Sequence, residues 1–394
     1  MKIDWKNPKK YLWPLNAITF NMYRLIPFRN DKLWIFGAWE GRKYDDNSRA
    51  LFEYVNEKYR DEIRCVWLTS EPRVVDAVRT LGYEAYLSES PDGRKLQKKA
   101  GVAIYTNGVM DFGLHPKIAG ALIVSLWHGV GFKKTYNEKY HGLKLLVKRI
   151  MDMFFSWTYR DVTLGTSKYV LGQFKSTFGL KDDSKMEITG QPRNDVFKKN
   201  LQKNVVLKKL NIDFSKKVIL YMPTYRSNGL PKDSMEKIIL GLYDNQIFRQ
   251  TLQKEGCAFI AKLHPLCGKI PIENKDDFLI LNSDDVDSVQ SLLAVCDVLI
   301  TDYSSCVVDF ALQEKPVIFY TPDHEQFITH SEPLFDEYYK IYSKNNCSTP
   351  ENLAEKIKNP SLEAVDTIND LFEDSQIKGS CYSENVYNSI VKYL

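Results

Sequence analysis

The sequence has no long hydrophobic run and no paired cysteines. No apolar stretch approaches the ~20 residues that an α-helix needs to span a bilayer. The seven cysteines are scattered without a C-x-x-C pair, which argues against a disulfide framework or a zinc cage and favours a reducing compartment. The first residues, Met-Lys-Ile-Asp-Trp-Lys, do not open a signal-peptide pattern. We therefore expect a cytoplasmic protein that is either soluble or peripheral to a membrane.

Several common catalytic signatures are also absent. The chain contains no G-x-x-x-x-G-K-[ST] phosphate loop, no G-x-G-x-x-G fingerprint, no H-E-x-x-H and no G-x-S-x-G. Asp285-Val286-Asp287 resembles the D-x-D that holds a metal-bound nucleotide in some sugar transferases. It falls directly before a predicted helix, however, where acidic residues cap the helix and complement its dipole. We therefore predict neither a metal nor a cofactor.

What is present is the composition and patterning of a large α/β protein. At 394 residues the chain is long enough for two or three domains. Its 44% hydrophobic and 26% charged residues are typical of globular proteins and exclude disorder and collagen-like repeats. Short apolar runs alternate with helical patterns at 48–59, 73–81, 286–295 and 306–313, which predicts parallel sheets. The strand-like runs form one set at 33–36, 64–68, 101–105 and 121–126, and a second at 218–222, 258–261, 278–281, 298–301 and 317–320.

The polar, lysine-rich stretch 197–217 separates the two sets, so we interpret it as a connecting helix and linker. The simplest architecture is two doubly wound, Rossmann-like domains facing a central cleft. We expect an N-terminal domain over 1–185, a C-terminal domain over 186–370 and a last helix over 371–394 that crosses back to the first domain. In such sheets ligands bind beyond the carboxyl ends of the strands.

Basic charge is concentrated in two aromatic-rich segments. The net charge is +4, but residues 1–43 carry +6 and residues 133–160 carry +5. Within the second segment, 142–157 has an apolar helical stripe with lysines beside it, formed by Leu143, Val147, Ile150, Phe154 and Trp157 with Lys144 and Lys148. Such helices often lie in a membrane interface, but the same period fits a core-facing helix with a solvated basic edge. No nucleic-acid-binding motif accompanies the charge, so we expect no nucleic-acid partner.

Residues suited to phosphate chemistry follow four of the predicted strands. His128 follows the run 121–126, Arg226 follows 218–222, and Lys262 and His264 follow 258–261. Ser304 and Ser305 follow 298–301 and open a helix, where hydroxyl and N–H groups could bind an anion. Arg226 and Lys262 could supply positive charge to a diphosphate, and His128 could act as a general base. His264 could donate to a leaving phosphate.

Each of these residues also has a structural alternative. A histidine at a strand end is often a buried structural residue, and a Ser-Ser pair before a helix is often an N-cap. Arg226 and Lys262 could equally be solvated surface charges. The concentration of all of them at strand ends favours a functional site.

Five motifs in order resemble the CDP-glycerol glycerophosphotransferase family, which comprises wall-teichoic-acid primases and polymerases and related capsule polymerases. The resemblance covers about residues 32–330. Its motifs are Trp127-His128-Gly129, Gly190-Gln191-Pro192-Arg193-Asn194-Asp195, Tyr221-Met222-Pro223-Thr224-Tyr225-Arg226, Lys262-Leu263-His264-Pro265 and Thr301-Asp302-Tyr303-Ser304-Ser305 with Asp309-Phe310-Ala311. Trp39 and Tyr44-Asp45-Asp46-Asn47-Ser48 are similar to the family's N-terminal acceptor-side motif.

The resemblance implies a metal-independent, GT-B-like transferase on the cytoplasmic face of a bacterial membrane. An acceptor hydroxyl would attack the β-phosphate of CDP-glycerol and release CMP. His128 would be the general base, and His264, Ser304 and Ser305 would hold the diphosphate and stabilise the departing CMP. The residues expected to line the substrate pocket are Trp127, Gly129, Arg193, Pro223, Thr224, Lys262, Leu263 and Asp309, with Arg226 added on charge grounds.

The expected partners are CDP-glycerol or CDP-ribitol, an undecaprenyl-diphosphate-linked acceptor and an anionic membrane surface that contacts 142–157. Homo-oligomerisation stays open. The family commonly has Thr-Pro where this chain has Val130-Gly131, so the acceptor or the polyol could differ. Two alternatives remain: a GT-B glycosyltransferase that uses a nucleotide sugar, and a catalytically silent module at a lipid surface.

Overall fold

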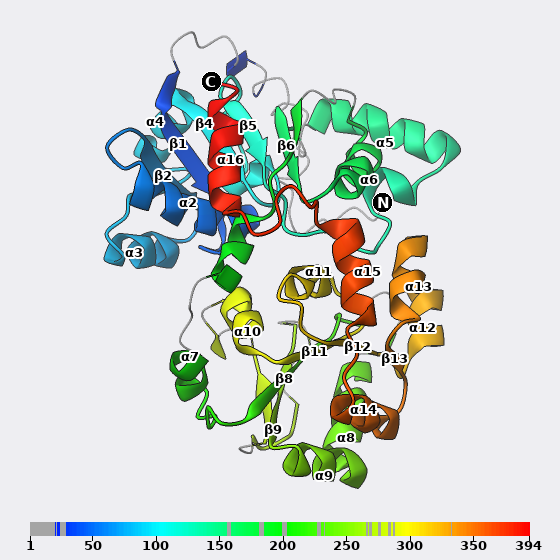
Figure 1. Cartoon of the computed structure of the whole chain (residues 1–394). Coiled ribbons are helices and arrows are strands. Elements are labelled where there is room, and N and C mark those ends of the chain that lie inside the picture. The colour runs from blue at the N-terminus through cyan, green and yellow to red at the C-terminus, as the bar shows by residue number, and fades with distance from the viewer. Residues whose placement is uncertain are drawn as a thin grey trace. The chain divides into compact units, whose positions relative to one another are not determined.

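Two parallel β-sheets organise the protein (Figure 1). The computed structural model describes residues 20, 22–23, 29–155, 159–180, 185–198, 203–226, 230–231, 233–264, 267, 270–274, 277–282, 285–286, 288–331 and 333–394. Within these residues, every pairing between named strands is parallel. This confirms the predicted α/β class.

The first sheet has seven strands in the described part of the chain. Most are continuous buried runs, as expected for strands with helices on both faces. In order across the sheet they are β3 (Ala85–Leu87), β2 (Arg64–Thr69), β1 (Asn30–Gly37), β4 (Ala100–Tyr105), β5 (Leu122–Ser125), β6 (Val162–Gly165) and β7 (Met186–Ile188).

Alternate residues of β1 supply two separate cores. Trp34 and Phe36 belong to a cluster with Phe52, on the face that α2 (Asp46–Lys58), α3 (Pro72–Thr80) and α16 (Tyr382–Val391) cover. Leu33 and Ile35 belong to a cluster on the opposite face, where α4 (Pro91–Lys99) packs. This two-residue period is what a strand buried on both sides requires.

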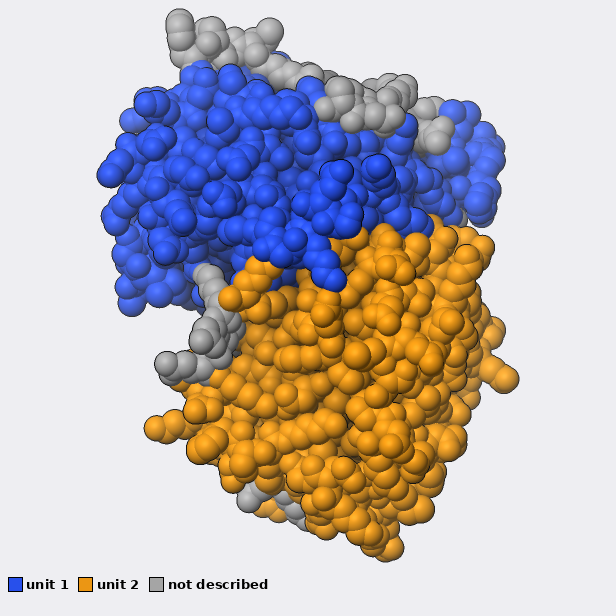
Figure 2. All heavy atoms as spheres, in the orientation of Figure 1, with its two compact units in different colours: residues 1–128, 136–195, 374–394 blue, residues 129–135, 196–373 orange. Residues whose placement is uncertain are grey.

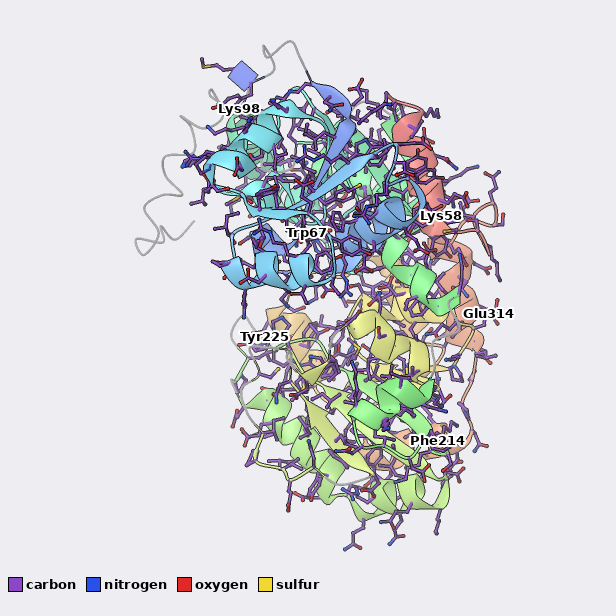
Figure 3. The ribbon with its side chains drawn as sticks, turned by 90° about the vertical axis from the view of Figure 1, so that its left-hand side faces the viewer. Lys58, Trp67, Lys98, Phe214, Tyr225 and Glu314 are labelled. Atoms are coloured by element: carbon purple, nitrogen blue, oxygen red, sulfur yellow. The ribbon has the colours of Figure 1, made fainter. Side chains whose placement is uncertain are left out.

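Side chains of the first sheet and of its covering helices differ in exposure. Trp67 of β2 is fully buried between the layers, whereas Lys58 and Lys98 lie exposed on α2 and α4 (Figure 3). The other segments are η3 (Trp39–Gly41), η4 (Val109–Phe112), η5 (Tyr136–Lys139), α5 (Gly142–Phe155), α6 (Lys168–Phe178) and η7 (Pro192–Lys198).

The second sheet has six strands among the described residues. In order they are β10 (Phe278–Leu281), β9 (Cys257–Lys262), β8 (Lys217–Met222), β11 (Val298–Thr301), β12 (Val317–Tyr320) and β13 (Asn346–Cys347). The accompanying helices are α7 (Lys203–Lys209), α8 (Ser234–Asp244), α9 (Gln246–Lys254), α10 (Val289–Val295), α11 (Cys306–Ala311), α12 (His324–His330), α13 (Asp336–Tyr342), α14 (Pro350–Lys358) and α15 (Glu363–Phe372).

The chain forms two compact units (Figure 2). Unit 1 holds the first sheet and consists of residues 1–128, 136–195 and 374–394. Unit 2 holds the second sheet and consists of residues 129–135 and 196–373. The chain therefore leaves unit 1 directly after His128, and α16 belongs to unit 1 although it follows unit 2 in sequence.

The nine predicted strands are all present, with ends within three residues of those expected. The sequence did not indicate β3, β6, β7 or β13. Each of these has only two to four residues, and β3, β7 and β13 lie at sheet edges. The predicted helices at 48–59, 73–81, 286–295 and 306–313 correspond to α2, α3, α10 and α11. The connecting stretch 197–217 contains α7, and its residues 199–202 lie outside the described residues.

Candidate active site

His128 lies at the carboxyl edge of the sheet of unit 1. It follows β5, while Asn107 follows the neighbouring strand β4 and Trp39 follows β1 beyond it. The ring centroid of His128 is 4.2 Å from that of Trp127 and 6.1 Å from that of Trp39. Asn107 Nδ2 lies 3.5 Å from His128 Nδ1. Loops from three strands thus meet at this imidazole, at the edge where α/β sheets bind ligands.

The imidazole of His128 is held in its neutral form. Burial lowers its pKa to about 4, and the positive charge of Arg193 acts in the same direction. A backbone hydrogen bond at Thr106 opposes this shift. Because the pKa lies well below 7, the side chain is unprotonated at neutral pH, which is the form that can accept a proton.

The backbone around His128 is clamped from two directions. Trp127 has a φ of 56°, in the left-handed region that bulky residues rarely adopt. The buried Asn47 donates from Nδ2 to the carbonyl oxygen of Trp127 at 2.9 Å. Arg193 donates from Nη1 to the carbonyl oxygen of His128 at 2.8 Å. Such a strained residue persists when its surroundings fix it, and these two bonds do so.

Arg193 contacts protein groups on several sides. Its Nη1 also donates to Asp46 Oδ1 at 2.8 Å, and the side chain is only 11% exposed. Its backbone N–H donates to Asn47 Oδ1 at 3.2 Å. We expected Arg193 in the nucleotide or glycerol-phosphate pocket, and the structure places its guanidinium against the backbone of His128.

Asp111 organises the loops beside His128, and sequence reasoning missed it. Its buried carboxylate accepts backbone N–H bonds from Glu40 at 2.7 Å, Thr106 at 3.0 Å and Asn107 at 2.8 Å. Burial raises its pKa to about 6, although these hydrogen bonds oppose the shift. A lone aspartate six residues past a strand carries no recognisable pattern, so no sequence signal could have singled it out.

In unit 2, Asp302 joins two strand ends. It follows β11, and its Oδ1 accepts the backbone N–H of Thr224 at 2.8 Å and that of Tyr303. Thr224 follows β8, the neighbour of β11 in the sheet. Asp302 is fully buried and was not among the predicted site residues. The carboxylate fixes the loop that leads into Ser304.

Arg226 is buried between two carboxylates. Its Nη1 donates to Asp302 Oδ2 at 2.7 Å, and its Nε and Nη2 donate to the two oxygens of Asp323 at 2.6 and 2.9 Å. The side chain is 1% exposed. We expected this charge to be offered directly to a diphosphate. In the structure the guanidinium is engaged by protein carboxylates and ties the ends of β8, β11 and β12 together, and its contact with a substrate stays a prediction.

Lys262 and His264 occupy different environments. Lys262 is buried at the end of β9, and its Nζ donates to the carbonyl oxygen of Leu263 at 3.3 Å. His264 is exposed and stacks on Tyr225, with ring centroids 5.3 Å apart. Tyr225 lies in the loop after β8 (Figure 3). Pro265, which completes the motif, lies outside the described residues.

Ser304 and Ser305 precede the short helix α11. The Ser304 hydroxyl accepts the backbone N–H of Cys306 at 3.4 Å, whereas Ser305 occupies the N-cap position without a side-chain capping bond. Asp309, inside α11, accepts a hydrogen bond from Gln290 Nε2 of α10 at 3.0 Å. Both serines are half-buried beside the Asp302 network. The Ser304 hydroxyl therefore makes only a long capping bond, and helix capping does not explain why residue 305 carries a hydroxyl.

Residues 18–392 match the family model described as CDP-Glycerol:Poly(glycerophosphate) glycerophosphotransferase. The chain belongs to this family. The match confirms the resemblance drawn from the five motifs, and with it the predicted class of transferase.

Relatives within the family include enzymes for glycerol and ribitol polymers. The chain is 28% identical over 358 residues to a teichoic acid poly(glycerol phosphate) polymerase of Bacillus spizizenii, covering 86% of each. It is 27% identical over 374 residues to a teichoic acid glycerol-phosphate primase of Bacillus subtilis, covering 91% of each. It is 24% identical over 327 residues to a teichoic acid ribitol-phosphate primase of Bacillus spizizenii, covering 81% of this chain and 79% of the relative.

The fold matches solved structures of the family. The wall teichoic acid polymerase TagF, as its H548A variant, superposes with a TM-score of 0.76 at 20% identity, covering 99% of this chain and 96% of that one. Its H444N variant with CDPG gives 0.74 at 20% identity, covering 98% and 96%. This likeness confirms the predicted GT-B-like fold.

The predicted site residues of this family member fall into two groups, one in each unit. Trp127, His128 and Arg193 lie together in unit 1. The group in unit 2 consists of Pro223, Thr224, Arg226, Lys262, Leu263, His264, Ser304, Ser305 and Asp309. Gly129, with a φ of 140°, is the first residue of the segment that passes to unit 2. No cluster of three or more potential metal ligands occurs among the residues that the structure describes.

The basic segment 142–157 forms α5 over Gly142–Phe155. Leu143, Leu146 and Val147 are 75%, 54% and 51% exposed. The alternative of a core-facing helix is therefore wrong for this first part of α5. The side chains of Ile150, Phe154 and Trp157 lie outside the described residues. Among the described helices, none combines the length and the apolar character that a bilayer span requires.

Proposed function

We propose that this protein transfers glycerol phosphate, or a related polyol phosphate, from its CDP-activated donor to a lipid-linked teichoic acid or capsule acceptor, releasing CMP. The observation that carries this proposal is the state of His128 within a glycerophosphotransferase-family chain: a half-buried, neutral imidazole at the carboxyl edge of a parallel sheet. Such a group is suited to accept a proton from an attacking hydroxyl.

The proposed reaction is a substitution at the β-phosphorus of the donor. An oxygen of the acceptor hydroxyl forms a new bond to this phosphorus, and the bond between phosphorus and the oxygen bridging to CMP breaks. The proton of the hydroxyl passes to His128, and CMP departs with the electron pair of the broken bond. Positioning and charge stabilisation supply most of the rate in phosphoryl transfer, and a placed base adds about 10²–10⁴-fold.

The low pKa of His128 fits a donor that carries negative charge. In the free enzyme, with a pKa of about 4, the imidazole is a weak base. A bound diphosphate would bring negative charge close to the ring and favour its protonated form. The imidazole would then become a stronger base when the donor is bound. In the absence of the donor, its low pKa keeps it unprotonated.

Residues of unit 2 are proposed to hold the donor. His264, Ser304, Ser305 and Lys262 would bind the diphosphate, because hydroxyl, imidazole and ammonium groups are suited to stabilise the charge on departing CMP. Pro223, Leu263 and Asp309 would line the nucleotide side. Thr224 adds support, since its buried Oγ1 has no hydrogen-bond partner among the residues that the structure describes, as expected for a hydroxyl that a ligand satisfies.

We also propose that the protein acts on the cytoplasmic face of the membrane as a peripheral protein. The exposed Leu143, Leu146 and Val147 beside the exposed Lys144 give α5 the apolar and basic surface that an anionic interface attracts. The acceptor would be linked to undecaprenyl diphosphate. Glycerol and ribitol both remain donors to test, because the relatives include enzymes named for each.

The decisive experiment measures CMP release from purified protein. CDP-glycerol and CDP-ribitol are offered in parallel with a lipid-linked disaccharide acceptor in detergent. We expect CMP from at least one donor, and a loss of about 10²-fold or more in His128→Ala with CDP-glycerol binding retained.

The matched control is His115→Ala, which removes an exposed histidine of the same unit and should leave CMP release unchanged. Activity of His128→Ala above about a tenth of wild type would contradict the role of the base. If neither CDP donor binds and a nucleotide sugar is consumed instead, the glycosyltransferase alternative replaces this proposal.

A further inference from the structure

The carboxylate of Asp195 caps the first turn of helix α16. Asp195 Oδ1 accepts the backbone N–H of Tyr382 at 2.8 Å, and Oδ2 accepts that of Ser383 at 2.8 Å and the thiol of Cys381 at 3.6 Å. These N–H groups have no partner within the helix, and a carboxylate also complements the positive end of its dipole. A residue nearly 190 positions earlier therefore fixes where α16 starts.

The body of α16 is anchored in the core of unit 1. Tyr387 stacks on Tyr59 with ring centroids 3.8 Å apart and lies 5.6 Å from the ring of Trp34. Val386 and Ile390 are fully buried in the same cluster. Tyr59 is the C-cap residue of α2, so α16 is packed against the helix whose first residue is Asp46.

Gly190 brings the motif against α16 from the other side. Its φ is 78°, and a Cβ at this position would meet the ring of Tyr382 at 2.1 Å. Only glycine combines that φ with such a close approach. The backbone that leads to Arg193 is thus seated directly on the first turn of α16.

Arg193 lies two residues before Asp195 in η7 and faces the site. Its Nη1 donates both to Asp46 Oδ1 and to the carbonyl oxygen of His128 at 2.8 Å. These contacts form a closed circuit. Asp195 binds the first turn of α16, and Arg193, in the same segment η7, binds His128 and Asp46. Asp46 begins α2, and α2 in turn packs against α16. The circuit includes the carbonyl of His128, which directly follows the strained backbone of Trp127, and so helps to hold that backbone in place.

We infer that Arg193 and Asp195 are positioning residues that latch the catalytic loop of His128 to the C-terminal helix α16. The inference rests on the proposed function of His128. Arg193 acts on the backbone of His128 and Asp195 acts through Arg193. The motif Gly190–Asp195 then fixes the orientation of His128, and α16 is a part of the active-site scaffold.

The test compares Asp195→Ala with Glu187→Ala. Glu187 accepts hydrogen bonds from Lys392 Nζ and Tyr393 OH, both at 2.6 Å, so its removal loosens the opposite end of the α16 region without touching the motif. We expect Asp195→Ala to lower kcat for CMP release about tenfold or more, because a displacement of ~1 Å can cost ~10²-fold. The Kd for CDP-glycerol should change less than about twofold, and Glu187→Ala should keep wild-type kcat.

Arg193→Gln provides a readout that a merely structural role would not move. Charged groups on the elements around His128 include Arg193 with its partner Asp46, and Asp111 behind the Asn107 backbone. Arg160 lies over the ring of Trp127 and Lys43 over the ring of Trp39, and both stay unchanged in the variant. Because Arg193 lowers the pKa of His128, removal of its charge should raise that pKa from about 4, as followed by NMR of labelled histidines. Glu187→Ala should leave it unchanged.

Equal losses of kcat in Asp195→Ala and Glu187→Ala, or an unmoved His128 pKa in Arg193→Gln, would overturn the latch. If Asp195→Ala does not fold, Asp195→Asn keeps one accepting oxygen and should show a smaller kcat loss in the same direction. Failure of the proposed function is distinguishable, because full activity of His128→Ala would refute the base while the NMR measurement would still report the latch.

Discussion

The side-chain amide of Asn47 donates a hydrogen bond of 2.9 Å to the carbonyl oxygen of Trp127, 80 residues further along the chain. Asn47 is fully buried, and its Oδ1 accepts the backbone N–H of Arg193 at 3.2 Å. One amide at the start of α2 therefore satisfies a backbone group next to His128 and another in η7.

Asn47→Ala should destabilise the protein and lower its activity together. Removing the amide leaves the buried Trp127 carbonyl without its donor, which costs about 1–3 kcal/mol in the free energy of unfolding. The measurement is urea unfolding together with kcat for CMP release. Asn56→Ala is the matched control, since Asn56 Nδ2 donates at 2.9 Å to the carbonyl oxygen of Phe52 in the same helix. If Asn56→Ala lowers kcat as much as Asn47→Ala, Asn47 has no special relation to the site.

The ionisation of His128 should depend on pH in an unusual range. NMR of labelled histidines should show one imidazole, absent in His128→Asn, that titrates near pH 4 rather than near 6.5. Because the folded-state pKa lies below the unfolded value, the unfolded chain binds the proton first on acidification. The stability that neutral His128 contributes is therefore present above about pH 6.5 and is lost as the pH falls towards 4. A titration near 6.5 in the free enzyme would contradict this.

Arg226→Met should destabilise unit 2 strongly. It leaves the fully buried Asp302 and the partly buried Asp323 without their cation, and loss of one partner from a buried ion pair costs about 3–5 kcal/mol. Urea unfolding checks this, with Arg249→Met as the control. The Arg249 pair with Asp277 is more open, with side chains 17% and 15% exposed, so its loss should cost less. Equal losses would show that burial of the Arg226 network is unimportant.

The exposed apolar residues of α5 should bind anionic membranes. Leu143→Asp combined with Val147→Asp should reduce co-sedimentation with phosphatidylglycerol vesicles, because both the apolar contact and the local positive charge are weakened. Phe214→Asp changes an equally exposed apolar residue of unit 2, 66% exposed and visible in Figure 3, and should have no effect. Undiminished binding of the α5 variant would remove this helix from the membrane contact.

Prediction from sequence succeeded where structure is local. Runs of four or more buried apolar residues, such as those in β8 and β9, are recognisable from their composition and from the helical patterns between them. Edge strands such as β13, with only Asn346 and Cys347, offer no such run. The strand-end positions of His128 and Ser304 were also predictable, because a parallel sheet gathers its carboxyl ends at one edge.

The partners of charged side chains were not predictable. Arg226 resembles a surface phosphate ligand in the sequence because Asp302 and Asp323 are 76 and 97 residues away. Arg193 likewise finds Asp46 across 147 residues. The fold alone decides whether a basic residue meets a substrate or a buried carboxylate, and here it engages both arginines within the protein.

The return of α16 to unit 1 has a consequence for the order of biosynthesis. The residues of unit 2 end at 373, whereas the core of unit 1 lacks Val386, Tyr387 and Ile390 until α16 has emerged from the ribosome. Domains generally fold as units during synthesis, with earlier segments first. Here the core of unit 1, which is translated first, is completed last, so the growing chain holds an unfinished hydrophobic face throughout the translation of unit 2.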